Sequence, residues 1–267
     1  MTPGAWTTLI AALARVEALP PDASGILSFG EPPFGAIFVD RGRVCWVAAD
    51  GLQRRLRDLL QHHAAIPDAA LDSVYERCRR EGRLLGETLV AEGWLSTAAL
   101  EAALRAHSAE SLIVLCARPA PLTWTPRLAA YHPEVSFAPL DLLGEVIASA
   151  VPDEAAAAAG ELAALDLPDV PVAVFAADPT GDALRPVAFR DSAATVDGLV
   201  AMSAWARALP LAAHELGVHP RMALASTTTG DSVLGWWRQG LLFAVVPRDR
   251  GQLALVTSRC LAIGDHP

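Results

Sequence analysis

Histidine side chains are the first candidates for chemistry, because imidazole is both a metal ligand and an acid–base group near neutral pH. His62 and His63 are adjacent. Neighbouring residues of a helix point to different sides, so this pair does not predict a metal site. His214 and His219 flank the expected end of a helix, and we interpret His214 as a cation at the helix C-terminus rather than as a general base.

Hydroxyl and carboxylate groups form no catalytic pattern either. The segment 226–231 reads STTTGD, and a polar turn between two strands explains that composition. The segment 178–182 offers too few well-spaced carboxylates for an EF-hand. The chain has no G-x-S-x-G, Walker A or G-x-G-x-x-G pattern. We therefore predict that the protein is not an enzyme and has no catalytic residue, metal site or cofactor.

Large aromatic side chains suggest a different kind of site, because tryptophan is enriched among the residues that dominate protein–protein binding. Trp236 and Trp237 are consecutive in an expected strand, so they point to opposite faces of a sheet. Trp205 and Leu209 lie on an expected long helix. We predict these four residues as interface candidates. The alternative, with one residue of the tryptophan pair in the core and the other covered by the first domain, fits the pattern equally well.

The composition favours a globular protein with a large core. Of the 267 residues, 52% are hydrophobic and 19% are charged, and the formal net charge is −9. This charge argues against a nucleic-acid or anionic-membrane partner. Lysine and asparagine are absent from the sequence. This amino-acid usage is typical of a bacterium with a GC-rich genome. Arg15 and Glu17 interrupt the first apolar stretch, so we expect no signal peptide, and no apolar run is long enough to span a membrane. We therefore expect a cytoplasmic protein.

The four cysteines, Cys45, Cys78, Cys116 and Cys260, are far apart and form no CxxC pair. This spacing predicts neither a disulfide framework nor a zinc site. Cys45 and Cys116 lie in apolar runs, which is typical of small buried hydrophobic residues.

The segment 82–107 organises the first half of the chain, because its apolar residues have the i, i+3, i+4 spacing of two short amphipathic helices. Gly93 suits the C-terminal cap of the first helix, and Ser96 suits the N-cap of the second. Elsewhere in this half we expect helices over 5–19, 52–63 and 140–150, strands over 25–29, 35–40, 43–48, 122–125 and 135–138, and four short helices within 67–117.

The proline-rich and alanine-rich stretch at 150–160 predicts a boundary between two domains, 1–150 and 151–267. In the second domain we expect a helix to about residue 165, strands over 170–177 and 184–190, a long helix over 198–216 kinked at Pro210, and strands over 221–226, 232–237, 241–246 and 252–258. The chain is therefore predicted to be α+β: a small β unit with a helical segment, followed by an antiparallel sheet with a long helix.

The first half resembles the PATAN-type domain of bacterial signalling proteins. Two groups of residues carry the resemblance: Asp40, Gly42, Arg43, Val44 and Ala48 in the strands, and Gly86, Glu87, Leu89, Val90, Gly93, Leu95 and Leu100 in the helical segment. Domains of that family are interaction modules joined to other signalling domains. The resemblance therefore implies a protein-binding module, with a component of a response-regulator pathway as one class of partner.

The segment 83–107 also resembles half of the MshE N-terminal motif, which binds cyclic di-GMP. Leu84 stands at the motif's Arg position, Arg83 comes one residue too early, and His107 stands at the Gln position. An unmatched buried hydrogen-bonding group costs about 1–3 kcal/mol, so we expect no useful affinity for a cyclic dinucleotide. A nucleotide sensor of the cyclic di-GMP type stays open as the alternative function.

The element order of 152–263 is similar to that of the roadblock/dynein-light-chain family. The sequences of the segments 200–217 and 241–258 also resemble that family. Members of that family bind Ras-like GTPases and commonly dimerise through the long helix. The resemblance implies a non-catalytic signalling adaptor that regulates a Ras-like small GTPase through protein–protein contacts, with a homodimer as a further expectation.

Overall fold

The computed structural model describes residues 1–52, 56–64, 66–127, 133–167, 170–177, 184–190, 195–196, 198–199, 201–202, 204, 222–226, 232–238, 240–247 and 249–263. The chain divides into two units. The N-terminal unit is Arg15–Val146, and the C-terminal unit is Ile147–Pro267 together with Met1–Ala14. Both units combine helices with an antiparallel sheet, so the expected α+β class is confirmed. The division into the domains 1–150 and 151–267 stays a prediction.

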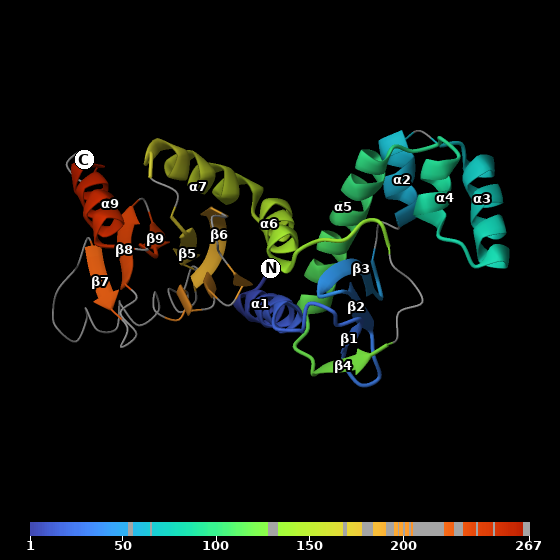
Figure 1. Cartoon of the computed structure of the whole chain (residues 1–267), viewed down its shortest axis with the longest axis horizontal. Coiled ribbons are helices and arrows are strands. Elements are labelled where there is room, and N and C mark those ends of the chain that lie inside the picture. The colour runs from blue at the N-terminus through green and yellow to red at the C-terminus, as the bar shows by residue number, and fades with distance from the viewer. Residues whose placement is uncertain are drawn as a thin grey trace. The chain divides into compact units, whose positions relative to one another are not determined.

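The N-terminal unit is built on a four-stranded sheet in the order β3-β2-β1-β4 (Figure 1). The turn between β2 and β3 contains Arg41 and Gly42, both with positive φ, as the tight turns of β-hairpins require. A single bridge between Val44 and Phe137 replaces the strand expected over 135–138. The strands are β1 (Gly25–Phe29), β2 (Gly35–Asp40), β3 (Arg43–Ala49) and β4 (Leu122–Pro126).

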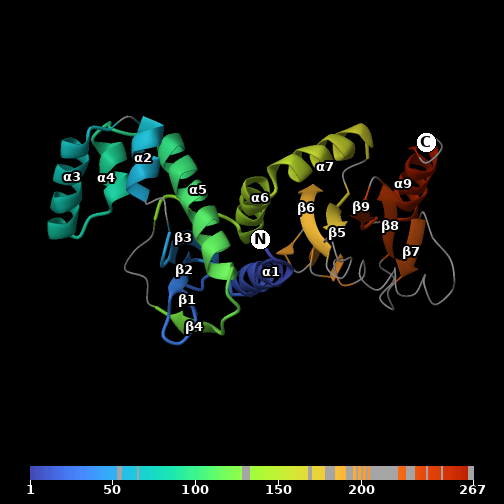
Figure 2. The same ribbon diagram turned by 180° about the vertical axis from the view of Figure 1, so that it is seen from behind.

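The connection from β3 to β4 holds four helices: α2 (Leu56–Ala64), α3 (Asp68–Glu81), α4 (Leu85–Ala91) and α5 (Thr97–Cys116). They lie side by side in both views, and α5 packs against α2 and β3 (Figures 1 and 2). The Ser96 hydroxyl caps α5 by accepting a hydrogen bond from the backbone N of Ala99 at 3.1 Å, as expected.

The segment 67–117 contains three helices where four were expected, because α5 is a single helix of 20 residues. Neither glycine nor proline interrupts its sequence, so no local signal ends the helix early. Two helices border this unit in the chain, α1 (Pro3–Glu17) and α6 (Pro139–Ala150). Among the residues that the structure describes, no helix combines the length and the apolar character needed to cross a membrane.

The C-terminal unit has a five-stranded antiparallel sheet in the order β6-β5-β9-β8-β7 (Figure 1). Its strands are β5 (Val172–Ala177), β6 (Leu184–Arg190), β7 (Met222–Ser226), β8 (Ser232–Arg238) and β9 (Leu241–Val245), and its helices include α7 (Pro152–Ala164) and α9 (Arg250–Ile263). Leu162 of α7 and Val256 of α9 belong to one buried cluster with Val174 and Phe243. Both helices therefore cover the same face of the sheet.

Residues 252–258 were expected to form a strand but lie within α9. Asp249 caps this helix, since its Oδ1 accepts a hydrogen bond from the backbone N of Gln252 at 2.8 Å. Val256 is buried whereas Leu255 is 44% exposed. The long helix expected over 198–216 falls mostly outside the described residues, although Thr195 Oγ1 accepts a hydrogen bond from the backbone N of Gly198 at its expected start.

Candidate functional site

The N-terminal unit contains a pocket of about 590 Å³ between the β2–β3 hairpin and the helices α4 and α5. Small-molecule sites in proteins usually measure about 300–1,000 Å³. The walls are mainly apolar: Phe38 and Trp46 come from the sheet, and Leu85, Leu100 and Leu104 come from the helices. The pocket is therefore large enough, and apolar enough, to take an organic molecule.

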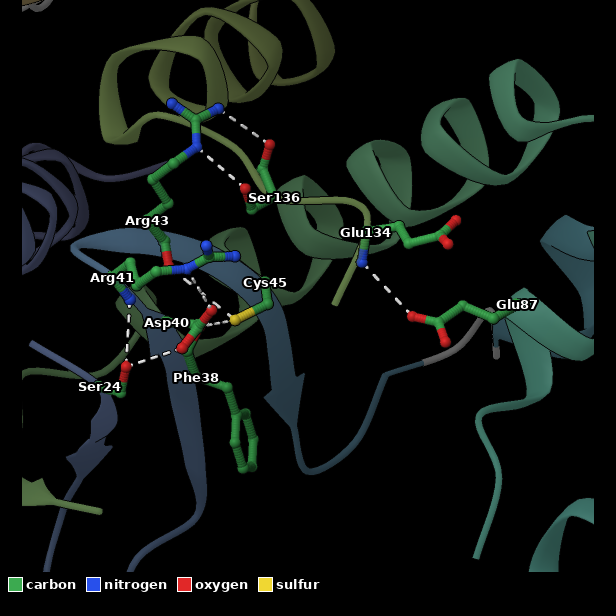
Figure 3. Close-up of polar contacts among 9 residues, drawn as sticks. All are labelled: Ser24, Phe38, Asp40, Arg41, Arg43, Cys45, Glu87, Glu134 and Ser136. Atoms are coloured by element: carbon green, nitrogen blue, oxygen red, sulfur yellow. Dashed lines mark hydrogen bonds and ion pairs between the residues drawn. The ribbon is translucent and has the colours of Figure 1, made fainter. Parts of the chain in front are cut away.

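A buried carboxylate lies at the hairpin end of the pocket. Asp40 is 5% exposed. Its Oδ1 accepts a hydrogen bond from Ser24 Oγ at 2.7 Å, and its Oδ2 accepts one from Arg41 Nε at 3.1 Å (Figure 3). Ser24 Oγ also accepts a hydrogen bond from the backbone N of Arg41 at 3.1 Å. This network fixes the β2–β3 turn to the residue that precedes β1, and it compensates the buried negative charge.

A β-bulge shapes the wall beside Asp40. Phe38 pairs with Trp46 and Val39 pairs with Val44, so Cys45 is an extra residue in β3. Consecutive residues of a regular strand point to opposite faces, whereas a bulge redirects a side chain. Cys45 and Trp46 accordingly both line the pocket.

The Cys45 thiol is held in its protonated form. Its Sγ donates a hydrogen bond to the carbonyl O of Phe38 at 3.4 Å (Figure 3). Burial, with a smaller contribution from the negative charge of Asp40, raises the pKa of Cys45 to about 11. Because the thiolate is the nucleophilic form, the raised pKa disfavours reaction of this cysteine at neutral pH. Its expected burial is confirmed.

Two further polar groups of the pocket hold chain segments together. Glu87 of α4 is half-buried, and its Oε1 accepts a hydrogen bond from the backbone N of Glu134 at 3.4 Å (Figure 3). Arg127 is exposed, and its backbone N donates to the carbonyl O of Ser24 at 2.9 Å. Outside the pocket lining, the Arg43 guanidinium donates to Ser136 Oγ at 2.9 Å and to Ser136 O at 3.0 Å (Figure 3).

Trp46 is supported from α5 by His107. The two rings are stacked, with their centroids 4.3 Å apart and an interplanar angle of 20°. His107 is buried, and its Nδ1 has no hydrogen-bond partner among the described residues. Burial lowers the pKa of His107 from 6.5 to about 4, so the imidazole is neutral at pH 7 and works as an aromatic packing group.

Of the four sequence-predicted interface residues, the structure describes Trp236 and Trp237. Trp236 is 5% exposed and stacks on Phe243 in the core of the C-terminal unit, with centroids 5.1 Å apart. Trp237 is half-buried. Trp205 and Leu209 lie outside the described residues. The role of these four residues as interface residues therefore stays a prediction.

The histidines and hydroxyl groups weighed in the sequence give little further information. His214, His219 and most of the segment 226–231 lie outside the described residues, as do the side chains of His62 and His63. Among the residues with described positions, no three His, Cys, Asp or Glu side chains are grouped to hold a metal ion.

The structure thus defines a class by geometry alone: an α+β protein of two units, one of which contains an apolar pocket with a buried carboxylate. Comparisons with protein-family models, with curated proteins and with solved structures give no match. The function is therefore argued from the site.

The reactivity of the cysteine thiols tests whether they are buried in the native protein. Burial raises the pKa of Cys116 to about 12 and contributes most to the raised pKa of Cys45. In a Cys260→Ser variant, which leaves only the three buried thiols, we expect no reaction with a disulfide reagent at pH 8 within an hour. All three thiols should react after unfolding in guanidinium chloride. Rapid reaction of one thiol in the native protein would contradict the burial of Cys45, Cys78 and Cys116.

Proposed function

We propose that this protein is a non-catalytic bacterial signalling adaptor that acts in the cytoplasm through contacts with another protein. One observation carries the proposal: the two reactive groups at its pocket, the Asp40 carboxylate and the Cys45 thiol, make hydrogen bonds that stabilise the fold. Both carboxylate oxygens of Asp40 accept hydrogen bonds from neighbouring side chains, and the Cys45 thiol stays protonated. General-base and nucleophilic catalysis need a group that is available to take a proton or attack. Asp40 is instead paired with the guanidinium of Arg41, and the protonated thiol of Cys45 is not the nucleophilic form.

The residues that carry the PATAN resemblance support the same proposal. Gly42 provides the positive φ of the hairpin turn, Arg43 binds Ser136, and Glu87 binds the backbone of Glu134. These contacts hold the β unit and the helices together as a scaffold. Such a scaffold suits an interaction module, in which function depends on the shape of a surface.

The proposed partner is a Ras-like small GTPase, or else a component of a response-regulator pathway, with a homodimer as a further outcome. Trp237 lies on β8 in the C-terminal unit and is half-buried, so a part of this side chain is accessible to a partner. Exposed aromatic residues are effective anchors at protein–protein interfaces. The N-terminal unit exposes a different tryptophan, Trp94, at 40%.

These two tryptophans provide a matched test of the proposed partner. The purified chain is titrated by biolayer interferometry against Ras-like GTPases of its source organism, loaded with GDP or with a GTP analogue. We expect Trp237→Ala to weaken binding by about tenfold, which is about 1.4 kcal/mol, and Trp94→Ala to have no effect. Sedimentation of the same proteins reports self-association. A wild-type monomer that binds no GTPase in either nucleotide state would contradict the proposal, as would weakening by Trp94→Ala alone.

The alternative of a nucleotide sensor is favoured by one observation and disfavoured by another. Leu84, Leu85, Gly86 and Glu87, from the segment that resembles half of the cyclic di-GMP motif, line the pocket. However, the carboxylate of Glu87 would repel a phosphodiester in an apolar environment, where charge interactions are stronger than in water, and Asp40 is already paired with Arg41. We therefore keep the expectation that cyclic di-GMP does not bind.

A further inference from the structure

We propose that the pocket of the N-terminal unit binds a small molecule with an apolar body and a single protonated amine. The proposal goes beyond the adaptor function, because it needs no protein partner and concerns a ligand that the adaptor itself would hold. It rests on the size of the pocket, its apolar walls, the position of its charges and its aromatic side chains.

The size and walls of the pocket determine the body of the ligand. The volume of about 590 Å³ is in the usual range for organic ligands. Ile26, Val39, Leu100 and Val135 contribute apolar side chains from four separate parts of the chain. Burial of apolar ligand surface against such walls supplies the main driving force for binding.

The position of the charges determines the ligand's polar group. Asp40 and Glu87 are the acidic residues of the pocket lining, and Arg127 is its basic residue. Asp40 is already paired with Ser24 and Arg41, so the half-buried Glu87 is the carboxylate that can meet a ligand, whereas Arg127 is exposed. Water and salt screen an exposed charge more effectively than a buried one, so the pocket interior favours a cation. An ionised carboxylate oxygen can accept more than one hydrogen bond. Glu87 therefore has capacity for an ammonium donor besides its 3.4 Å contact with the backbone of Glu134.

The aromatic side chains favour the same charge. Phe38 and Trp46 both line the pocket, and the faces of aromatic rings attract cations, tryptophan most strongly. Stacking on His107 fixes the Trp46 ring in place. The wall is also closely packed where α4 meets α5, since a Cβ added to Gly86 would lie 2.6 Å from Leu100 Cδ1. A site formed in advance loses little entropy when the ligand binds.

The test compares three probes of equal chain length on the full chain: octylammonium, octanol and octanoate, below their micellar concentrations. Calorimetry and the shift in unfolding temperature measure binding. We expect octylammonium to bind at least tenfold more tightly than octanoate, with octanol between them. Glu87→Gln should weaken octylammonium binding by about tenfold and leave octanol binding unchanged. The glutamine keeps a carbonyl oxygen that can accept the hydrogen bond from Glu134, so we expect the variant to fold.

Glu92→Gln is the matched control, because Glu92 follows the last residue of α4 and pairs with Arg77 outside the pocket lining. It should leave the affinity for all three probes unchanged. Three results would overturn the proposal: no binding of any probe, tighter binding of octanoate that Arg127→Gln removes, or micromolar binding of cyclic di-GMP to the pocket. The GTPase titration tests the adaptor proposal alone, and the three probes test the ligand proposal alone. Each proposal can therefore be contradicted without affecting the other.

Discussion

Replacing Gly35 with alanine is expected to lower the free energy of unfolding by about 3 kcal/mol, at the upper end of the usual cost of overpacking. A Cβ at this position would lie 2.2 Å from Leu115 Cδ2 and 2.5 Å from the backbone O of Ala48. Leu115 is fully buried in α5, and Ala48 is held in β3 by its pairing with Ala36. Neither neighbour can move away without disturbing the packing of α5 on the sheet.

Urea unfolding of the full chain, followed by circular dichroism, measures this effect. Gly160→Ala is the control, because Gly160 lies within α7 and a Cβ added there meets nothing within 4 Å. Alanine is the better helix former, so this variant should gain about 0.5–1 kcal/mol. Equal stability of the Gly35→Ala variant and the wild type would show that α5 and β3 can separate more easily than their packing implies.

Acidification from pH 6.5 to pH 4 is expected to remove roughly 3 kcal/mol of stability through His107 alone. The imidazole has an ordinary pKa of 6.5, and burial lowers the pKa of His107 to about 4 in the folded protein. Between these two values the unfolded chain binds a proton that the folded protein excludes. The contribution is therefore complete above pH 6.5 and is lost as the pH falls towards 4.

The variant His107→Phe isolates this contribution. Phenylalanine keeps an aromatic ring for stacking on Trp46 and removes both the titrating group and the Nδ1 that lacks a partner among the described residues. Unfolding free energies of the two proteins are compared from pH 7 to pH 4. The difference between them should change by roughly 3 kcal/mol across this range. A constant difference would assign the acid sensitivity of the protein to its carboxylates instead.

Features of the fold that depend on neighbouring residues could be predicted from the sequence. Ser96 caps α5 as expected, and the strands expected over 35–40 and 43–48 form a hairpin with its turn at Gly42. Both depend on a local pattern, namely a hydroxyl before an apolar run and a glycine between two strand-like runs. The fate of 252–258 could not be decided in this way, because a short apolar run fits a strand and a buried helix equally well.

The pocket could not be predicted because its residues meet only in the folded unit. Ser24, Trp46, Leu104 and Val135 come from distant parts of the sequence. The bulge at Cys45 depends on how β3 pairs with β2, which is a property of two strands rather than of one. The burial of Cys45 itself was predictable from its apolar neighbours, but its position beside a buried carboxylate was not.

The pairing of β1 has a consequence for the synthesis of the chain. β1 pairs with β2 on one side and with β4 on the other, and every residue from Gly30 to Pro121 is made between β1 and β4. Translation at about 5–20 residues per second leaves one edge of β1 without its partner for on the order of ten seconds. During that time the ribosome carries a β1–β2–β3 meander with an open edge. The unpaired N–H and C=O groups on that edge of β1 find their partners only when β4 emerges, so the open edge is the part of this unit most exposed to wrong pairing during synthesis.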